Sequence, residues 1–271
     1  MTSAATPERH ARADFARRAD RAERLAEDSL AAREPLLFAA GLYRAQGGLA
    51  ALLAERHGNR PFAGRLDEDV LRLVEAQPEL LTFVSRQGPP QLAEQAAARA
   101  GEPPAEAASR LLAWWTGERD TREDYLSRAL LRPYVESLAG LGVKPSRPSQ
   151  PGHCPFCAGP PWIASLRSEE EAEGAARHLV CALCGREWPF GRILCPGCGE
   201  EDPRQLPAFQ SEKHPGVRLQ ACDSCRGYLK AIDLSLDARP IPEVDDLVSL
   251  GMDLWAAEQG YTRLEPGLAG L

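Results

Sequence analysis

The sequence predicts an α+β protein of several domains, with an N-terminal all-α helical domain, two tandem metal-binding units and a C-terminal helix. Three observations support this prediction. Residues 1–142 repeat segments rich in Ala, Leu, Arg and Glu between Pro and Gly breaks, as amphipathic helices do. All eight cysteines lie between residues 154 and 225, and a segment with apolar residues at helical spacing follows them.

Five segments are expected along the chain. Its 271 residues suffice for about two domains of ordinary size. Three prolines and the lack of a large apolar residue after Val143 predict an extended linker. The segments are a helical domain at 1–142, the linker at 143–153, a first metal-binding unit at 154–192, a second at 193–236, and a C-terminal helix and tail at 237–271.

Hydrophobic periodicity predicts seven helices in the first segment and one after the cysteines. The last is expected at 243–259, closed by Gly260. Acidic residues in its first turn, Asp245 and Asp246, are interpreted as helix caps that also favour the helix dipole. Trp114 and Trp115 are expected in a core, because large aromatic side chains are mostly buried. The first seven helices are predicted near 10–32, 35–56, 67–76, 78–86, 89–101, 104–116 and 121–140.

Every cysteine belongs to a C-x-x-C pair, and the pairs repeat at a fixed offset. A shift of 41 residues carries the first two pairs onto the last two, so the chain contains two copies of one structural unit. Four thiolates from two such pairs suit a tetrahedral metal ion. The repeat predicts one site made by Cys154, Cys157, Cys181 and Cys184, and another made by Cys195, Cys198, Cys222 and Cys225.

The ligand type leaves the metal open, because tetrahedral thiolate sites suit Zn(II) and rubredoxin-type iron equally. Each unit is therefore expected to be rubredoxin-like or zinc-ribbon-like. With four cysteines per site, His153, His178 and His214 are not needed as ligands. Disulfide bonds are the alternative, but no signal peptide is readable near the N-terminus, which favours a reducing compartment.

Glycines mark the turns of the C-x-x-C pairs. Gly185 and Gly199 directly follow the second cysteine of their pairs, where a positive φ directs backbone N–H groups towards sulfur. At the other two pairs Ala158 and Arg226 occupy this position and the glycine comes one residue later. Those two turns are expected to be slightly wider.

Composition and the absence of known motifs exclude several function classes. The net charge is −7 and no segment is basic, which argues against nucleic acid as a partner. The longest apolar run, at 35–43, is too short to span a bilayer, so the expected location is the cytoplasm. No phosphate-binding loop, nucleophile elbow or zinc-protease motif is present, and closed four-cysteine sites leave no open metal position. We therefore expect no catalytic residues.

The cysteine motifs and the tail follow a recognisable order. They read CPFCAGPP at 154–161, LVCALCGREW at 179–188, CPGCG at 195–199, CDSCRGYLK at 222–230, VDDL at 244–247 and EQGY at 258–261. This order resembles the bacterial formate dehydrogenase accessory proteins of the FdhE type. The resemblance covers about residues 150–262; in the helical half it consists of element order and short segments such as PLLFA at 35–39.

The resemblance implies a cytoplasmic factor that is needed for active formate dehydrogenase and binds its catalytic subunit. It also implies rubredoxin-like iron in both sites, with zinc as the alternative metal. Four side chains near the last turn of each repeat are candidates for partner contact: Arg186, Trp188, Tyr228 and Lys230. For Trp188 and Tyr228 an equally good interpretation is that they cover the core of the metal sites.

Two other function classes stay open at this point. A redox or sulfur-handling protein could use iron–thiolate sites or labile cysteines, and ligands alone reveal neither potential nor lability. A zinc-ribbon protein that binds nucleic acid is disfavoured by the charge. The sequence leaves open the oligomeric state, the formate dehydrogenase that is served and the stage of its maturation.

Overall fold

The computed structural model describes residues 7–59, 61–168 and 174–270. These residues form two compact units. The first combines the chain up to Glu23 with Leu37–Pro148, and the second combines Arg24–Leu36 with Ser149 to the C-terminal end. The division at Pro148 falls inside the segment predicted as a linker. Part of that segment is anchored in the first unit, where the Ser146 amide donates to the Gly64 carbonyl at 2.7 Å.

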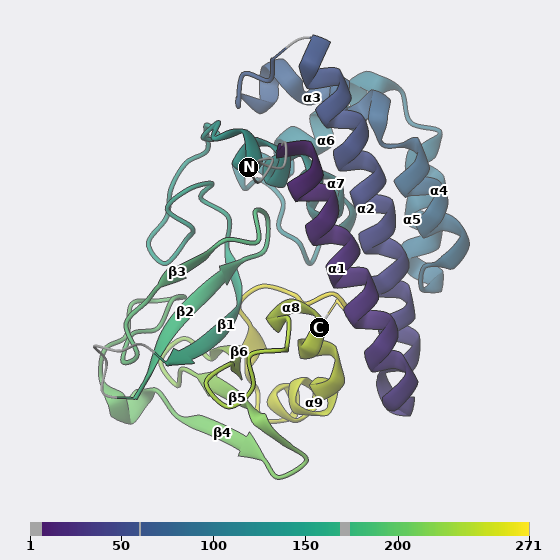
Figure 1. Ribbon diagram of the computed structural model, residues 1–271. Coiled ribbons are helices and arrows are strands. Elements are labelled where there is room, and N and C mark those ends of the chain that lie inside the picture. Colours follow the sequence, from purple (N-terminus) through teal and green to yellow (C-terminus); the bar gives the residue numbers. More distant parts are fainter. Residues whose placement is uncertain (1–6, 60, 169–173, 271) are drawn as a thin grey trace, which may run out of the picture. The chain divides into compact units, whose positions relative to one another are not determined.

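Among the described residues before the cysteines, the α-helices occur in the predicted number. Their order along the chain is followed by colour in Figure 1. Their ends differ by up to four residues: the first helix ends at Asp28 instead of 32, and the last begins at Tyr125 instead of 121. The Asp124 side chain caps it by accepting from the Ser127 amide at 2.9 Å, and Gly117, at φ 86°, has already ended the helix before it. The helices are α1 (Pro7–Asp28), α2 (Arg33–Asn59), α3 (Leu66–Ala76), α4 (Pro78–Gln87), α5 (Pro90–Ala100), α6 (Pro104–Thr116) and α7 (Tyr125–Leu141).

The core of the first unit combines aromatic side chains with buried ion pairs. Trp114 and Trp115 are both buried, as expected. Arg18 donates to both carboxylate oxygens of Glu136, at 2.8 and 3.0 Å, and all of these groups are buried. Buried pairs of this kind restrict the helices to one packing, because a displaced partner would leave a charge without compensation.

One stretch of this half, Leu30–Arg56, is long and apolar enough to cross a membrane by length and composition alone. Of its most apolar 18 residues, 56% are buried within the chain. A core helix of a water-soluble protein passes the same test, so the stretch is weak evidence for a membrane span. It is longer than the apolar run recognised in the sequence because small residues extend it on both sides.

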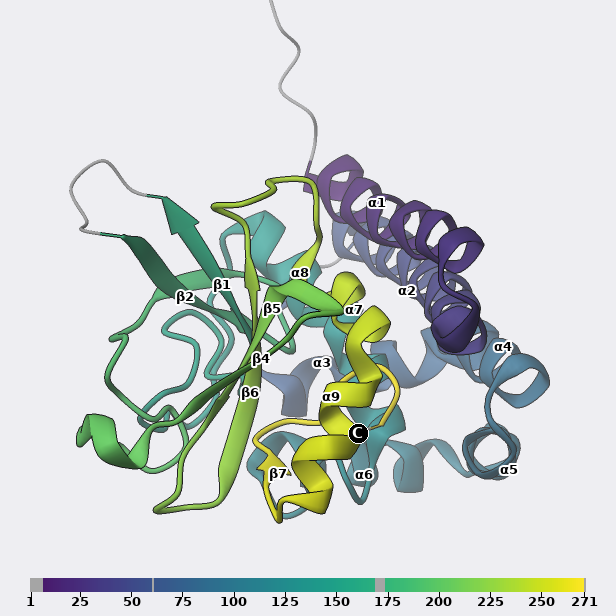
Figure 2. The same ribbon diagram turned by 90° about the horizontal axis from the view of Figure 1, so that it is seen from below.

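The described strands of the second unit form one sheet built from both repeats (Figure 2). The strand order is β3-β2-β1-β6-β5-β4, and β7 pairs with part of β6. Strands of the same repeat pair antiparallel, whereas β1 and β6 join the repeats as a parallel pair. The strands are β1 (Pro161–Ser168), β2 (Ala175–Cys181), β3 (Glu187–Pro189), β4 (Ala208–Ser211), β5 (His214–Ala221), β6 (Gly227–Asp233) and β7 (Thr262–Arg263).

This topology refines the predicted pair of tandem units. The 41-residue offset relates β2 to β5 and β3 to β6, so the duplication is visible in the strands. The two copies nevertheless share one sheet, because Ala164 pairs with Ala231 across the junction. The sequence contains no local signal for this pairing, since parallel neighbours are brought together only by a long connection.

The C-terminal helix is interrupted rather than continuous. It consists of α8 (Pro242–Asp245), a 3-10 turn at Asp246–Ser249 and α9 (Leu250–Glu258). The buried Lys230 ammonium donates to the carbonyls of Asp246 and Ser249, at 2.9 and 3.3 Å, at the two ends of the 3-10 turn. Gly260, at φ 76°, closes α9 as predicted.

Candidate metal centres

The structure brings the eight cysteines together as the two predicted quartets. In the first, the sulfur atoms of Cys154 and Cys184 lie 3.6 Å apart, and those of Cys157 and Cys181 lie 3.3 Å apart. In the second, the corresponding distances are 3.8 Å for Cys195 and Cys225 and 3.7 Å for Cys198 and Cys222. Within each quartet all four sulfurs lie within 4.8 Å of one another.

These distances fit a tetrahedral metal ion. With metal–sulfur bonds of about 2.3 Å, four sulfurs at tetrahedral angles lie roughly 3.8 Å apart. A disulfide would need about 2.05 Å between two sulfurs, and all eight cysteines are free. The disulfide alternative is therefore wrong for this structure. Two sites that can each hold one metal ion are present.

All four C-x-x-C turns share one backbone pattern. The amide of the first cysteine donates to the carbonyl five residues later, at 2.8–3.0 Å in every case. Backbone amides also approach ligand sulfurs: those of Leu183 and Cys184 lie 3.4 Å from the Cys181 sulfur, and that of Gly197 lies 3.4 Å from the Cys195 sulfur. Such N–H groups stabilise negative charge on sulfur.

The residue after the second cysteine is left-handed in all four turns, whether or not it is glycine. Gly185 and Gly199 have φ of 66° and 78°, and Ala158 and Arg226 have φ of 54° and 57°. The expectation of wider turns at Ala158 and Arg226 was wrong. The chain keeps the same turn there at the cost of a left-handed non-glycine residue, because the turn directs both cysteines towards one point.

Gly159 is required for close packing in the first centre. A Cβ atom at this position would lie 2.7 Å from the Cys181 sulfur and 3.2 Å from the Cys157 sulfur. Gly227 has a similar place in the second centre, where a Cβ would lie 3.1 Å from the Cys225 sulfur and 2.6 Å from the Leu264 side chain. The glycines that follow Ala158 and Arg226 thus leave room for the ligands themselves.

Thiol pKa values differ within each quartet. Hydrogen bonds from the other three thiols lower the pKa of Cys154, whereas burial raises the pKa of Cys181. Burial also raises the pKa of Cys195 in the second quartet. Thiols with a raised pKa hold their protons at neutral pH until a cation displaces them. Metal binding must therefore release protons at both centres.

The two centres differ in exposure. All four cysteines of the first quartet are buried. In the second quartet Cys195 and Cys222 are buried, but Cys198 and Cys225 are exposed. Since reagents reach exposed sulfur more readily, the second centre is the more accessible of the two.

The histidines lie outside the quartets, as expected. Among the described residues, no histidine contributes to either group of potential metal ligands. His153 is half-buried, and its Nδ1 lies 3.2 Å from the Pro151 carbonyl oxygen. Burial and nearby lysines lower the pKa of His214.

Three of the four residues predicted to contact a partner are buried. Trp188 lies on β3, and Tyr228 and Lys230 lie on β6 with exposed fractions of 3% and 0%. The structure does not present these side chains at a surface, and it favours the alternative that Trp188 and Tyr228 belong to the core. Arg186 is exposed, with its guanidinium 4.0 Å from the centre of the Phe156 ring.

A buried charge cluster explains why Lys230 faces inwards. Its ammonium contacts carboxylates of Asp246 and Asp253, at 2.9 and 2.5 Å. The Arg263 guanidinium contacts the same two carboxylates at 2.9 and 3.1 Å, and the Tyr228 hydroxyl donates to Asp253 at 2.9 Å. Two cations thus face two anions, which connects β6 to the C-terminal segment.

This cluster was missed from the sequence. Asp245 does act as a cap, since its carboxylate accepts from the Ile241 amide at 2.7 Å. Asp246 does not, because it is buried against Lys230 and Arg263. The sequence did carry a signal for it. Lys230 lies among the mostly apolar residues 227–233, and Asp246 and Asp253 lie among the mostly apolar residues 244–256.

Comparisons with known proteins agree with this geometry. Residues 153–192 match the model of the FdhE central domain, and residues 193–268 match that of the FdhE C-terminal domain. The boundary between the two models coincides with the boundary between the repeats. Residues 153–268 are thus similar in sequence to the central and C-terminal domains of FdhE proteins.

Curated FdhE homologues match the same half of the chain. The homologue from Aquifex aeolicus is 35% identical over 118 residues, which are 44% of this chain and 41% of that protein. The homologue from Pseudomonas aeruginosa is 38% identical over 122 residues, covering 42% of this chain and 38% of that protein. These alignments span about two fifths of the relatives' own lengths.

A solved structure extends the similarity to the helical half. The crystal structure of the FdhE protein from Pseudomonas aeruginosa matches 95% of this chain and 95% of its own, with a TM-score of 0.66 and 27% sequence identity. The helical half followed by a sheet region with two four-cysteine clusters and a C-terminal helix is therefore an FdhE fold.

Proposed function

We propose that this protein is a cytoplasmic accessory factor needed to obtain active formate dehydrogenase, and that it acts by binding the catalytic subunit of that enzyme. The observation that carries the proposal is the FdhE match, by domain models over 153–268 and by fold over 95% of the chain. The role itself comes from the family resemblance. It is compatible with the site, because the structure offers two closed thiolate quartets and no open metal position among the described residues.

Both quartets are proposed to bind metal, with iron as the resident ion and zinc as its substitute. The residues fit such an ion, because the sulfur–sulfur distances within each quartet match tetrahedral coordination. A bound ion supplies rigid cross-links between irregular loops. With four protein ligands it has no free position for water or substrate, so we propose that the protein is not an enzyme.

A redox or sulfur-handling role is the second candidate, and one observation favours it. Cys198 and Cys225 are exposed, whereas every cysteine of the first quartet is buried. An exposed thiolate ligand can be oxidised or exchanged without unfolding the chain. Such a role would be restricted to the second centre.

The partner surface is proposed to include Arg186. Its guanidinium is exposed next to the first centre and is held over the Phe156 ring, which limits the entropy lost on binding. Trp188, Tyr228 and Lys230 would then contribute indirectly, by supporting the sheet and the C-terminal segment.

Affinity capture tests this proposal. The tagged chain, expressed at native level in its source cell, should co-purify with the catalytic subunit of formate dehydrogenase. Cells without the gene should lose most formate dehydrogenase activity. Arg186→Glu should weaken capture while both metals stay bound; Arg239→Glu, at an arginine with 85% of its side chain exposed, is the matched control.

Unchanged formate dehydrogenase activity in the deletion strain would contradict the accessory role. Loss of activity without capture of the subunit would instead contradict the binding step. Retained activity in a Cys198→Ser and Cys225→Ser variant that has lost the second metal would exclude the redox alternative at that centre.

A further inference from the structure

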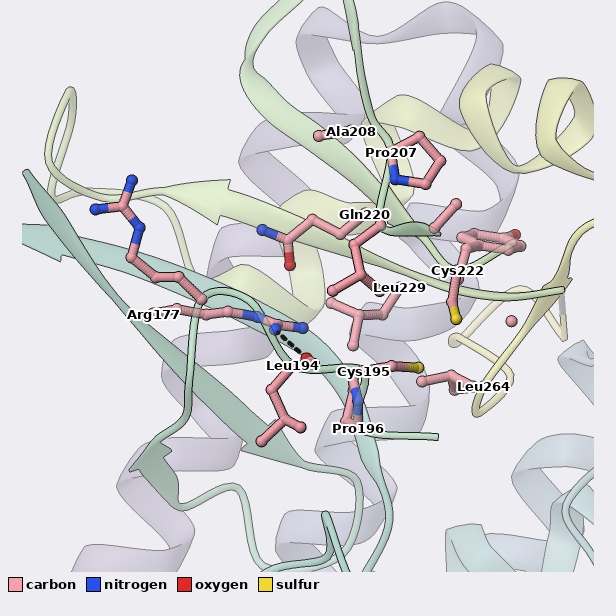
Figure 3. A pocket seen from close by; sticks show the side chains of 15 residues that line it. Arg177, Leu194, Cys195, Pro196, Pro207, Ala208, Gln220, Cys222, Leu229 and Leu264 are labelled. Atoms are coloured by element: carbon pink, nitrogen blue, oxygen red, sulfur yellow. Dashed lines mark hydrogen bonds between the residues drawn. The ribbon is translucent and has the colours of Figure 1, made fainter. Parts of the chain in front are cut away.

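A pocket of about 90 Å³ lies in the second unit, beside the second cysteine quartet. Arg177 on β2, Gln220 on β5 and Leu229 on β6 line it, together with Cys195 and Cys222 (Figure 3). Apart from these cysteines, the ionisable side chains that line the pocket are arginines and Tyr228, and no Asp or Glu is among the described lining residues. A volume of this size exceeds that of one water molecule, which occupies about 30 Å³ in the liquid.

Strand register explains why Arg177 and Gln220 face the same space. Arg177 pairs with Leu166, which pairs with Asp233, so these three side chains share one face of the sheet. Asp233 and Leu229 are four residues apart on β6 and therefore share that face, and Leu229 pairs with Gln220. In Figure 3 the Arg177 and Gln220 side chains extend towards the same part of the pocket from strands at different positions in the sheet.

Arg177 is a buried cation with one unused edge. Its exposed fraction is 5%, and its Nη1 donates to the carbonyls of Gly191 and Leu194, at 3.0 and 2.9 Å. Its Nε has no hydrogen-bond partner, and no carboxylate pairs with the guanidinium among the described residues. Burial lowers the pKa of Arg177 to about 10, and the nearby Cys195 acts in the opposite direction, so the guanidinium stays charged at neutral pH.

The free edge has a defined chemistry. In a guanidinium, Nε–H and the Nη2–H beside it point the same way and bind two oxygens of one carboxylate or oxyanion. The Gln220 amide oxygen is also buried without a partner. Rotation of that amide by 180° presents its NH2 group instead, which adds a third donor to the pocket.

We propose that this pocket binds a small oxyanion, a carboxylate or a tetrahedral anion such as sulfate, through the Nε and Nη2 edge of Arg177 and the amide of Gln220. The anion supplies the oxygen acceptors that the buried Nε lacks, next to an arginine whose electrostatic neighbour is Cys195. It also occupies a place next to the second cysteine centre, because Cys195 follows Leu194, whose carbonyl Arg177 holds.

Isothermal titration calorimetry of the full, metal-loaded chain tests the proposal, with sodium acetate and sodium sulfate as separate probes at constant ionic strength. Saturable binding of at least one probe is expected; acetate alone identifies a planar carboxylate site, and sulfate alone a tetrahedral one. Arg177→Lys keeps the positive charge but cannot form the bidentate hydrogen bonds of a guanidinium. Binding should therefore weaken at least about tenfold, a factor that corresponds to about 1.4 kcal/mol.

Two further variants keep the test independent of folding. Gln220→Leu approximately preserves the side-chain shape and leaves the Arg177 hydrogen bonds to the Gly191 and Leu194 carbonyls in place, and it should weaken binding at least about threefold because one charge-assisted hydrogen bond is lost. Arg204→Gln removes an equal charge at a side chain that is 85% exposed and outside the pocket, and it should change affinity less than about twofold. Absence of saturable binding by both probes, or unchanged affinity in Gln220→Leu, would overturn the proposal.

Discussion

Single backbone positions decide the geometry of the cysteine turns. Ala158 and Arg226 adopt the left-handed conformation that glycine adopts at Gly185 and Gly199. A left-handed non-glycine residue costs roughly 1–2 kcal/mol. The chain accepts this cost twice, because the turn must direct two cysteines towards one point.

Ala158→Gly should therefore stabilise the protein by up to about 1 kcal/mol, since relief of the left-handed strain outweighs the entropy that glycine loses on folding. Chemical denaturation of the metal-loaded chain measures this. Ala182→Gly, in the next turn and without a positive φ, is the control and should destabilise the protein. A loss of stability in Ala158→Gly as large as in the control would contradict the strain argument.

Gly159→Ala should disrupt the first centre and leave the second intact. The new Cβ would lie 2.7 Å from the Cys181 sulfur, a distance that real Cβ atoms essentially never show. Metal analysis should find about one equivalent of metal less per chain than in the unaltered protein. Gly216→Ala is the matched control, because no atom lies within 4 Å of the added Cβ. Full metal content in Gly159→Ala would refute this role of the glycine.

At the scale of elements, the charge cluster between β6 and the C-terminal segment is the main feature. Lys230 and Arg263 face Asp246 and Asp253, and all four side chains are nearly inaccessible to solvent. The cluster lies where the C-terminal helix is interrupted, and it connects α9 to the sheet. Removal of one partner leaves a buried charge without compensation, which is costlier than loss of an exposed pair.

Asp246→Asn should lower the free energy of unfolding by about 3 kcal/mol or more. Asp237→Asn is the control, because its partner Arg239 has 85% of its side chain exposed; the change should cost less than about 1 kcal/mol. Urea denaturation monitored by Trp fluorescence compares the two variants. Equal losses of stability would show that the cluster contributes no more than a surface pair.

The same carboxylate predicts an acid dependence. Burial acts to raise the pKa of Asp246, but the charges of Arg263 and Lys230 outweigh it and hold that pKa below its usual range. A carboxyl with a depressed folded pKa stabilises the fold above its unfolded value, about 3.9, and this contribution is lost as the pH falls through the folded pKa. The stability of the unaltered protein should decline below about pH 4, and that decline should be smaller in Asp246→Asn.

At the scale of the whole molecule, two chemically alike centres occur in unlike surroundings. The first quartet is entirely buried, and half of the second is exposed. A chelator reaches an exposed ligand without local unfolding, whereas a buried site must open first. The duplicated units should therefore differ in kinetics even though their ligands are identical.

Metal release should be biphasic. Metal analysis should find two equivalents per chain, and a chelator in excess should remove one faster than the other. Cys225→Ser should abolish the fast phase, and Cys184→Ser the slow one. Both phases should accelerate at lower pH, because protons compete with metal for thiols whose pKa is raised, such as Cys181 and Cys195. A single phase for the unaltered protein would contradict the asymmetry.

The sequence by itself determined the ligand sets and most of the helices. The C-x-x-C spacing places two sulfurs in one turn, and the 41-residue offset indicates which two turns form one unit. Together they specify which four cysteines form each site. Helix periodicity is local in the same way, and α1 to α7 follow it.

Only the tertiary structure decided how the repeats combine and which side chains are buried. The β1 and β6 strands, at Pro161–Ser168 and Gly227–Asp233, pair across a long stretch of chain, and such parallel pairing has no local pattern. Tyr228 and Lys230 were expected at a surface, but the C-terminal segment covers them, because Asp246 and Asp253 compensate the buried ammonium. A charged side chain such as that of Lys230 can be buried only when another segment supplies a partner of opposite charge. The spacing of residues in the sequence does not show which distant segment that is.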